Sequence, residues 1–216
     1  MTGYETETVA LRIGGLDYRI RMLKDRQQYS DPDGSAERAG ISSATWPLFG
    51  MFWPAGLALA EAMTHFPVEG KRILEVGCGT GLSSLVLQRR GADVTASDHH
   101  PLAAEFLEHN VQLNALPPIR YHDAQWQEPN PELGEFDMII GGDVLYERDH
   151  PALLAGFIER HAKPHACVVI AEPGRGYRGQ FSSRMLAQGY TRSEQPFTGD
   201  GAVNETKGRI LRFDRL

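Results

Sequence analysis

The segment EVGCGTG, residues 75–81, has the composition and spacing of a loop that binds a small charged ligand. It follows the apolar run RILEV and precedes LSSLVLQRR, so it joins a buried strand to an amphipathic helix. The glycines allow a tight turn and let a ligand approach the backbone at the positive end of the helix. A dinucleotide requires G-x-G-x-x-G, but Leu82 or Ser84 stands where the last glycine would be. The loop therefore disfavours a pyrophosphate ligand.

Acidic residues at three successive strand ends indicate which ligand the loop binds instead. Glu75 repels a pyrophosphate but suits the cationic amino-acid end and the sulfonium of S-adenosylmethionine. Asp98 closes DVTASD, where an acid can accept hydrogen bonds from both ribose hydroxyls. Asp123 in HDAQW can accept from the adenine amino group, and Trp126 offers an aromatic face to the ring. Any one of these residues could be a helix cap or a core side chain. Together, at one sheet edge, they predict an S-adenosylmethionine site.

A fourth strand end carries Asp143 and Tyr146, in GGDVLY after the apolar run FDMII. Ligands of open α/β sheets bind at the carboxyl ends of the strands, so a methyl acceptor would meet the cofactor here. If the acceptor is an alkyl amine, its ammonium form has a pKa of about 10.4 and must lose a proton before it can react. We predict that Asp143 accepts a hydrogen bond from the incoming amine or anchors its loop. Tyr146 shapes the pocket and can orient or pass a proton, and neither residue is predicted to be a strong general base.

The order of elements that must position these residues predicts an α/β fold. From residue 71, short β-branched runs alternate with helical patterns, which is typical of βαβ units and a parallel sheet. Two final strands, 190–194 and 208–214, have little helix between them and predict an antiparallel hairpin at one sheet edge. The prediction is a Rossmann-like, doubly wound, seven-stranded sheet, mostly parallel with an antiparallel last strand. The other five strands are predicted at 72–76, 93–98, up to 123, 136–143 and 166–173.

The acids and the glycine loop together resemble the class I, seven-β-strand methyltransferases. FWPAG, QW and DVLY are similar to motifs of the methyltransferase-16 family, whose characterised members are mostly protein lysine methyltransferases. The resemblance implies that Trp53 walls the cofactor pocket and that Asp143 and Tyr146 lie beside the transferable methyl group. Family members often have Leu-Asp-Trp where this chain has Ala124-Gln125-Trp126, so only the aromatic residue carries over. The predicted cofactor-binding residues are Trp53, Glu75, Gly77, Cys78, Gly79, Gly81, Asp98, His99, Asp123, Ala124, Trp126 and Gly142.

The predicted function is transfer of a methyl group from S-adenosylmethionine to an amine nitrogen, with S-adenosylhomocysteine as product. The expected acceptor is a protein lysine side chain. A small-molecule N- or O-methyltransferase and a cofactor-binding scaffold or sensor are the alternatives. An oxidoreductase is compatible only if the missing glycine is ignored. Residues 51–216 are predicted to form the methyltransferase domain. Residues 1–50, with a β-hairpin around Gly14-Gly15 and a polar loop, are predicted to extend that same domain.

Composition limits the partners and the location. The net charge is −6 with no long basic run, which disfavours nucleic acid, and GRGYRG at 174–179 is interpreted as a solvated loop. The eight histidines lack metal-ligand spacing, so no metal site is predicted. No run is apolar enough for a membrane span, and no signal peptide is recognised. With only Cys78 and Cys167, reduced thiols and a cytoplasmic location are expected. The sequence does not give the oligomeric state, for which a monomer is favoured.

Overall fold

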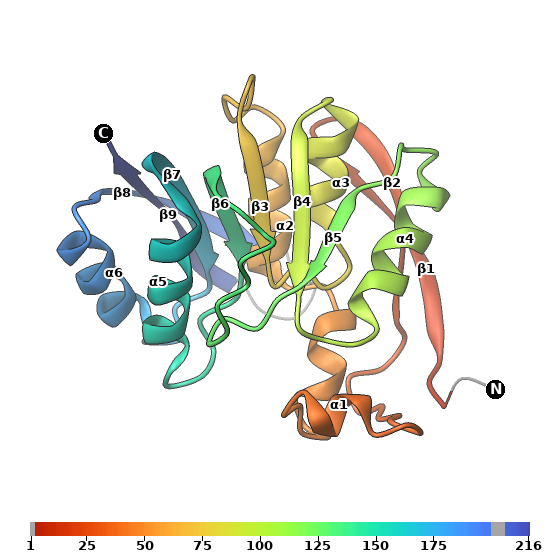
Figure 1. The fold of residues 1–216 in the computed structure, drawn as a ribbon. Coiled ribbons are helices and arrows are strands. Elements are labelled where there is room, and N and C mark those ends of the chain that lie inside the picture. The colour runs from red at the N-terminus through yellow and green to blue at the C-terminus, as the bar shows by residue number, and fades with distance from the viewer. Residues whose placement is uncertain (1–2, 200–205) are drawn as a thin grey trace.

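The computed structural model describes residues 3–199 and 206–216, which form a seven-stranded sheet and a separate two-stranded hairpin (Figure 1). The strand order in the main sheet is β5-β4-β3-β6-β7-β9-β8. The first five strands of this order are parallel, whereas β9 runs antiparallel to both of its neighbours. The strands are β3 (Arg72–Val76), β4 (Asp93–Asp98), β5 (Arg120–Asp123), β6 (Phe136–Gly142), β7 (Ala162–Glu172), β8 (Thr191–Gly199) and β9 (Thr206–Arg215). The predicted fold class is confirmed.

Three strands are longer than predicted, and one of them, β9, extends the predicted 208–214 by two residues at its start and by one at its end. β7 begins at Ala162, four residues before the predicted start, because it follows the last residue of a helix without a loop. The added residues include Lys163, Pro164 and His165, which are polar or conformationally restricted and carry no apolar signal. β8 extends to Gly199 because it pairs with β9 along its whole length. The final hairpin is antiparallel, as predicted, and β9 occupies its inner position.

Helices cover both faces of the sheet and bury two separate cores (Figure 1). One face packs on α2 (Pro54–Met63), α3 (Leu82–Arg89) and part of α4 (Ala103–Leu113). The opposite face packs on α5 (His150–His161) and α6 (Arg178–Ala187). Alternate residues of the central strands point to opposite faces, so Ile139 joins one core and its neighbour Ile140 the other. This arrangement leaves the carboxyl ends of the parallel strands open to ligands.

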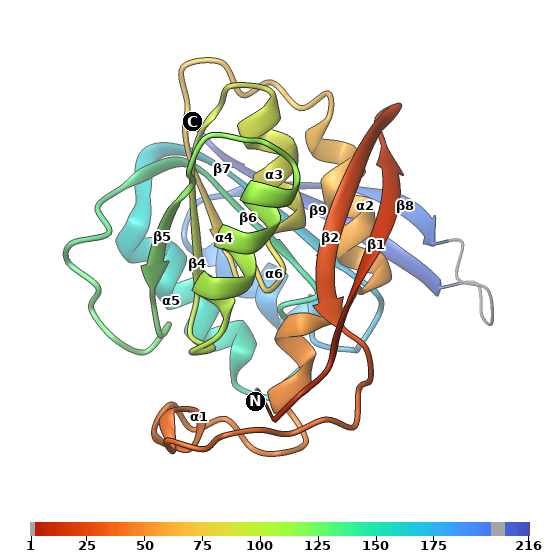
Figure 2. The same cartoon turned by 90° about the vertical axis from the view of Figure 1, so that its right-hand side faces the viewer.

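The N-terminal hairpin is β1 (Thr6–Ile13) paired with β2 (Leu16–Leu23), and it lies beside the helices on one side of the sheet (Figure 2). The turn is Gly14-Gly15, as predicted, and both glycines have positive φ. Two asparagines of α4 hold the edge of β2. The amide of Asn114 bonds the backbone N–H and C=O of Arg19, and the amide of Asn110 does the same at Arg21. These amides pair with the edge of β2 as a further strand would.

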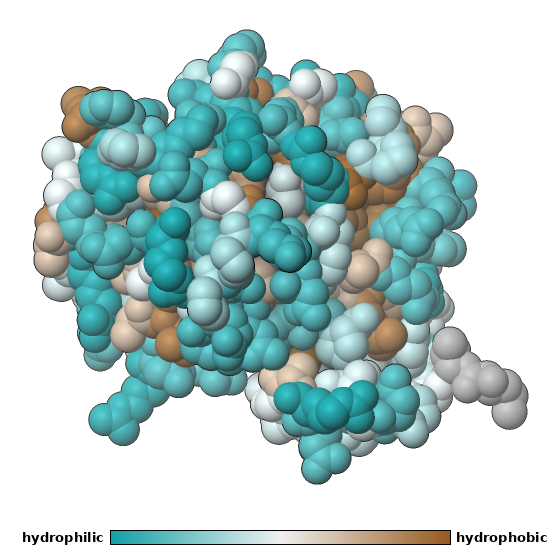
Figure 3. All heavy atoms as spheres, in the orientation of Figure 1, coloured by the Kyte–Doolittle hydropathy of each residue, from teal (hydrophilic) through white to brown (hydrophobic). Residues whose placement is uncertain are grey.

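The chain between the hairpin and the main sheet passes over the carboxyl ends of the strands. It contains the short helix α1 (Ser35–Arg38) and the 3-10 helix η1 (Trp46–Gly50), whose Trp46 is fully buried. Within the described residues, no helix has the length and apolarity of a membrane span. The face drawn in Figure 3 is largely hydrophilic, with hydrophobic residues gathered in small areas.

Candidate active site

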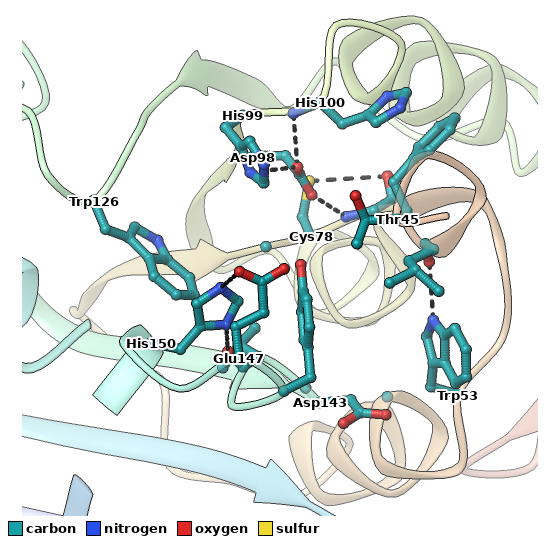
Figure 4. Close-up of a pocket in the computed structure, with 18 of the residues that line it drawn as sticks. Thr45, Trp53, Cys78, Asp98, His99, His100, Trp126, Asp143, Glu147 and His150 are labelled. Atoms are coloured by element: carbon teal, nitrogen blue, oxygen red, sulfur yellow. Dashed lines mark hydrogen bonds and ion pairs between the residues drawn. The ribbon is translucent and has the colours of Figure 1, made fainter. Parts of the chain in front are cut away.

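A cavity of about 670 Å³ lies at the carboxyl ends of β3, β4 and β6, and η1 and the start of α2 form its opposite wall. Its size is that of a pocket for a nucleoside-sized ligand. Asp98 and Asp143 lie on opposite sides of the cavity (Figure 4). Twelve of the fourteen predicted site residues line it: Trp53, Glu75, Gly77, Cys78, Gly79, Asp98, His99, Ala124, Trp126, Gly142, Asp143 and Tyr146. Gly81 and Asp123 do not.

The glycine loop has the backbone conformation that the sequence predicts. Gly77, Gly79 and Gly81 all have positive φ, between 52° and 79°. A Cβ on Gly79 would stand 2.4 Å from the carbonyl oxygen of Phe49, so only glycine fits beneath η1. Gly81 lies at the start of α3, where a Cβ would meet the side chain of Leu107. Its role is therefore to let the helix pack closely rather than to line the cavity.

Glu75 is buried at the end of β3 and fastens the loop to α3. One carboxylate oxygen accepts hydrogen bonds from the Ser84 backbone N–H at 2.8 Å and from the Ser84 hydroxyl. Burial raises the pKa of Glu75 from 4.5 to about 7, against the opposing effect of the Ser84 hydrogen bonds. Near neutral pH, this acid is therefore ready to lose a proton when a cation is placed beside it.

Asp98 ends β4 and is also buried, and its oxygens accept backbone hydrogen bonds. The N–H of Gly79 donates to one oxygen at 2.8 Å and the N–H of His100 to the other at 2.9 Å. A carboxylate offers about four lone-pair sites, so two remain for a diol. The neighbouring His100 stacks on Phe49 with ring centroids 3.6 Å apart. Burial lowers the pKa of His100 to about 4, so this ring is neutral.

The end of β5 differs from the prediction. Asp123 is exposed and outside the cavity although it pairs in register with Asp98, because β5 is the edge strand of the sheet; the buried residue that lines the cavity is the next one, Ala124. The Ala124 N–H instead donates to the backbone oxygen of Asp98 at 3.1 Å. Trp126 lies in the cavity wall, half-buried, with its ring perpendicular to that of His150 at 5.2 Å. The aromatic face that was expected after this strand is therefore present, without the acid.

Asp143 is paired with an arginine that the sequence analysis missed. Its two carboxylate oxygens accept from Nε and Nη2 of Arg175 at 2.7 and 2.8 Å. The side chain of Asp143 is 4% exposed, and the hydrogen bonds from Arg175 occupy one position on each oxygen. The interpretation of GRGYRG as a solvated loop is thus wrong for Arg175, which lines the cavity. The available signal was its place directly after β7, the strand beside β6.

Tyr146 is half-buried, and its ring meets that of His150 at 4.4 Å, edge to face. Burial raises the pKa of the Tyr146 hydroxyl, so it stays protonated and can only donate or accept a hydrogen bond. His150 is fixed by donation from Nδ1 to the Val144 carbonyl at 2.9 Å. Ligand atoms of Glu147, Asp149 and His150 lie within 4.8 Å of one another, although both acids are exposed at the rim.

The sequence matches the methyltransferase-16 family, described as lysine methyltransferase, over residues 47–185. This chain belongs to that family. The match contains the segments that form the glycine loop, the DVLY motif and Arg175.

Curated relatives of the family share about a third of their aligned residues with this chain. The electron transfer flavoprotein beta subunit lysine methyltransferase of Xenopus laevis is 31% identical over 169 residues, which is 75% of this chain and 65% of the relative. The protein N-lysine methyltransferase METTL21A of Danio rerio is 38% identical over 147 residues, 64% of this chain and 59% of the relative. The chain thus spans less than two thirds of the length of either relative.

Solved structures share the fold at lower identity. A 16S rRNA methyltransferase of T. thermophilus, solved with AdoMet and guanosine, has a TM-score of 0.66 and 18% identity. The match covers 98% of this chain and 51% of that one. The magnesium protoporphyrin IX methyltransferase of Synechocystis, solved with bound SAM, has a TM-score of 0.60 and 16% identity, covering 76% and 80%. These likenesses confirm the Rossmann-like methyltransferase fold.

The residues of the cavity fit S-adenosylmethionine, the cofactor expected for this family. Two buried acids, Glu75 and Asp98, line the cavity, and among the described residues neither is ion-paired with a lysine or arginine. That leaves negative charge for a cationic ligand. The close approach at Gly79 and the aromatic wall of Trp126 suit the backbone and ring contacts of a nucleoside.

Proposed function

We propose that this chain transfers a methyl group from S-adenosylmethionine to an amine nitrogen, and that the acceptor is a lysine side chain of a protein. One observation carries the proposal: a single cavity contains both the predicted cofactor residues and the Asp143 and Tyr146 pair. When bound, the cofactor would supply a methyl group on a sulfonium: the lone pair of a neutral amine would form the new N–C bond, the C–S bond would break, and S-adenosylhomocysteine would be the leaving group. The protein has to orient that amine, exclude water and accommodate the loss of its proton.

The roles of the acceptor residues follow from their surroundings. Tyr146 keeps its proton, so it orients the amine through a hydrogen bond and limits the width of the pocket. Asp143 has both oxygens engaged by Arg175 and retains lone pairs for a hydrogen bond from the amine. Neither group is placed to act as a strong base, so the proton leaves to water before transfer. No metal ion is required in this proposal.

The cofactor residues retain their predicted roles as proposals. Asp98 would accept from the ribose hydroxyls, Glu75 would face the cationic end, and Trp53 and Trp126 would wall the pocket. The backbone of the glycine loop would approach the ligand closely. For Asp123, we withdraw the adenine contact because its side chain is exposed and outside the cavity. The remaining members of the set are Gly77, Cys78, Gly79, His99, Ala124 and Gly142.

The acceptor class is supported by the relatives, which are named as protein lysine methyltransferases. We propose a protein partner, and we keep a small metabolite as the alternative outcome of the test. A monomer that binds neither nucleic acid nor membrane remains our prediction. Cys78 and Cys167 are buried and unpaired, which supports a reducing compartment, and we propose the cytoplasm. Imaging of a fluorescent fusion would test the location.

The test uses radiolabelled S-adenosylmethionine with the purified protein and a cell lysate. Label in a discrete protein band is the expected result, label only in small molecules supports the alternative acceptor, and no label with intact cofactor binding supports a sensor. Asp143→Ala and Tyr146→Phe should bind the cofactor as the wild type does and lose about a hundredfold or more in transfer. If both variants turned over as fast as the wild type, the assignment of these two residues to the acceptor site would be wrong.

A further inference from the structure

Asp143 and Arg175 form a bidentate ion pair in the wall of the cavity. Asp143 adopts a left-handed backbone conformation with φ of 57°, and its N–H donates to the Ala171 carbonyl at 2.8 Å. A non-glycine residue in this region is held there by its surroundings. Arg175 lies between Gly174 and Gly176, whose φ values of 92° and 90° let the loop turn back toward β6. Both segments are therefore shaped to bring the two side chains together.

Arg175 also contacts the wall of the cofactor pocket. Its guanidinium carbon lies 5.7 Å from the centroid of the Trp53 ring, within the range of a cation–π contact. The side chain is 39% exposed, while that of Asp143 is 4% exposed. Arg175 thus closes the acceptor end of the cavity from the solvent side. The carboxylate it covers is the one that the incoming amine must reach.

Other charged groups lie near this pair, and the buried Glu172 also acts electrostatically on Arg175. Glu172, at the end of β7, faces Arg178 at 3.7 Å. Arg26 stacks over the outer part of the cavity wall, 5.1 Å from the Trp53 ring centroid. The further groups that face the cavity are the protonated Tyr146, the rim residues Glu147, Asp149 and His150, and, at the opposite end, Glu75, Asp98, His99 and His100. Asp143 and Arg175 cancel one another directly, through two short hydrogen bonds.

We propose that Arg175 is a positioning residue that cancels the charge of Asp143, so that the acceptor end of the cavity holds an amine without favouring its protonated form. The inference rests on the proposed function. An unpaired carboxylate within about 4–6 Å of an amine raises the pKa of that amine by roughly 1–3 units, which removes the reactive lone pair. A carboxylate neutralised by a bidentate arginine still accepts an N–H hydrogen bond from the neutral amine, but it no longer holds the ammonium ion.

The first test measures binding of n-butylammonium, the amine end of a lysine side chain, to protein saturated with S-adenosylhomocysteine at pH 8. Arg175→Gln should bind this cation about tenfold more tightly than the wild type, because Asp143 is then unpaired. Arg175→Lys keeps the charge and should stay within about threefold of the wild type. The double variant Asp143→Asn with Arg175→Gln should return to the wild-type affinity. Unchanged or weaker binding by Arg175→Gln would overturn the inference.

The second test compares pH profiles of methyl transfer to the labelled acceptor. Arg175→Gln should shift the rising limb of kcat toward alkaline pH by about one unit, since kcat reports the pKa of the bound complex. Arg178→Gln is the matched control, because Arg178, three residues further along the chain at the start of α6, faces Glu172 and does not line the cavity. Its profile should not move. A shift of equal size in both variants would show a structural effect and overturn the inference.

The two proposals fail in different ways. A wild-type protein that binds neither S-adenosylmethionine nor S-adenosylhomocysteine would overturn both. Normal cofactor binding and methyl transfer by the wild type, together with no change in amine binding or pH profile on loss of Arg175, would overturn only the inference. If Arg175→Gln does not fold, the comparison can still be made with Arg175→Lys and with the double variant. Neither of these variants leaves Asp143 as a buried unpaired carboxylate.

Discussion

The acids at the two ends of this cavity are held in opposite ways. At the cofactor end, Glu75 and Asp98 accept hydrogen bonds from backbone N–H groups and a serine. At the acceptor end, Asp143 faces an arginine directly. An acid without a cation of its own is suited to a ligand that brings a positive charge, as the cofactor does. A carboxylate that is already paired with an arginine, as Asp143 is, is suited to a ligand that has to bind in its neutral form. Under the proposed function, this difference would let one sheet edge bind a cation and a free amine side by side.

The largest expected effect comes from removing the cofactor-end acid of β4. Asp98→Ala should weaken S-adenosylmethionine binding about a hundredfold, the loss expected for charged hydrogen bonds to a diol worth about 3 kcal/mol. Isothermal titration calorimetry measures it directly. Asp123→Ala, at the end of the next strand, is the matched control and should change the affinity by less than about twofold. Equal losses in both would break the distinction between these two strand ends.

The next prediction concerns the ionisation of Glu75 and its effect on the stability of the folded protein. Because burial raises its pKa from 4.5 to about 7, the folded protein keeps this proton to higher pH than the unfolded chain does. Stability from this group is complete below pH 4.5 and falls by about 3 kcal/mol as pH rises through 7. Glu75→Gln keeps an acceptor for Ser84 but has no proton to lose. It should therefore unfold at higher denaturant concentration than the wild type above pH 7, and not below pH 4.5.

Glu75→Gln also tests how the binding of S-adenosylmethionine depends on pH. A cation beside Glu75 favours the ionised acid, so wild-type affinity for S-adenosylmethionine should rise with pH up to about 7 and protons should be released on binding. Glu75→Gln should lose that pH dependence and about tenfold in affinity at pH 8. Titration in buffers of different ionisation enthalpy measures the released protons. An unchanged release in the variant would assign it to another group.

A smaller effect concerns the support behind the glycine loop. The fully buried amide of Asn110 donates to the Thr80 carbonyl at 2.9 Å and also binds the backbone of Arg21. Asn110→Ala should lower the free energy of unfolding by about 2 kcal/mol, because buried backbone groups lose their partner. Asn114→Ala removes the hydrogen bonds to Arg19 and to the Asn110 carbonyl but none to the glycine loop, so it should cost less and leave cofactor binding unchanged. Chemical denaturation and calorimetry separate the two outcomes.

The smallest expected effect tests the wall between the two ends. Arg26 is exposed and stacks over Trp53. Arg26→Ala should reduce cofactor affinity by less than about threefold, since an exposed cation–π contact is worth about 0.5–1 kcal/mol. A much larger loss would mean that the chain passing over the cavity, and not the strand ends alone, determines binding.

The sequence by itself determined the fold, and it predicted most of the residues that line the cavity. Strand and helix periodicity predicted the seven strands and their approximate bounds, because buried runs repeat at the spacing of the backbone geometry. The positive φ of Gly77, Gly79 and Gly81 also followed from sequence, since these positions depend on local turn geometry. The polar start of β7 was missed because it has no apolar pattern to detect.

The tertiary structure alone decided which strand-end side chains face the cavity. Asp123 looks equivalent to Asp98 in the sequence and pairs with it in register, but β5 is the edge strand of the sheet and the side chain of Asp123 is exposed. Arg175 reads as part of a solvated loop, and only the pairing of β6 with β7 brings it to Asp143 across a separation of 32 residues. Local sequence specifies backbone conformation within a few residues. Charge pairing depends on which strand ends become neighbours, and long-range sheet order sets that.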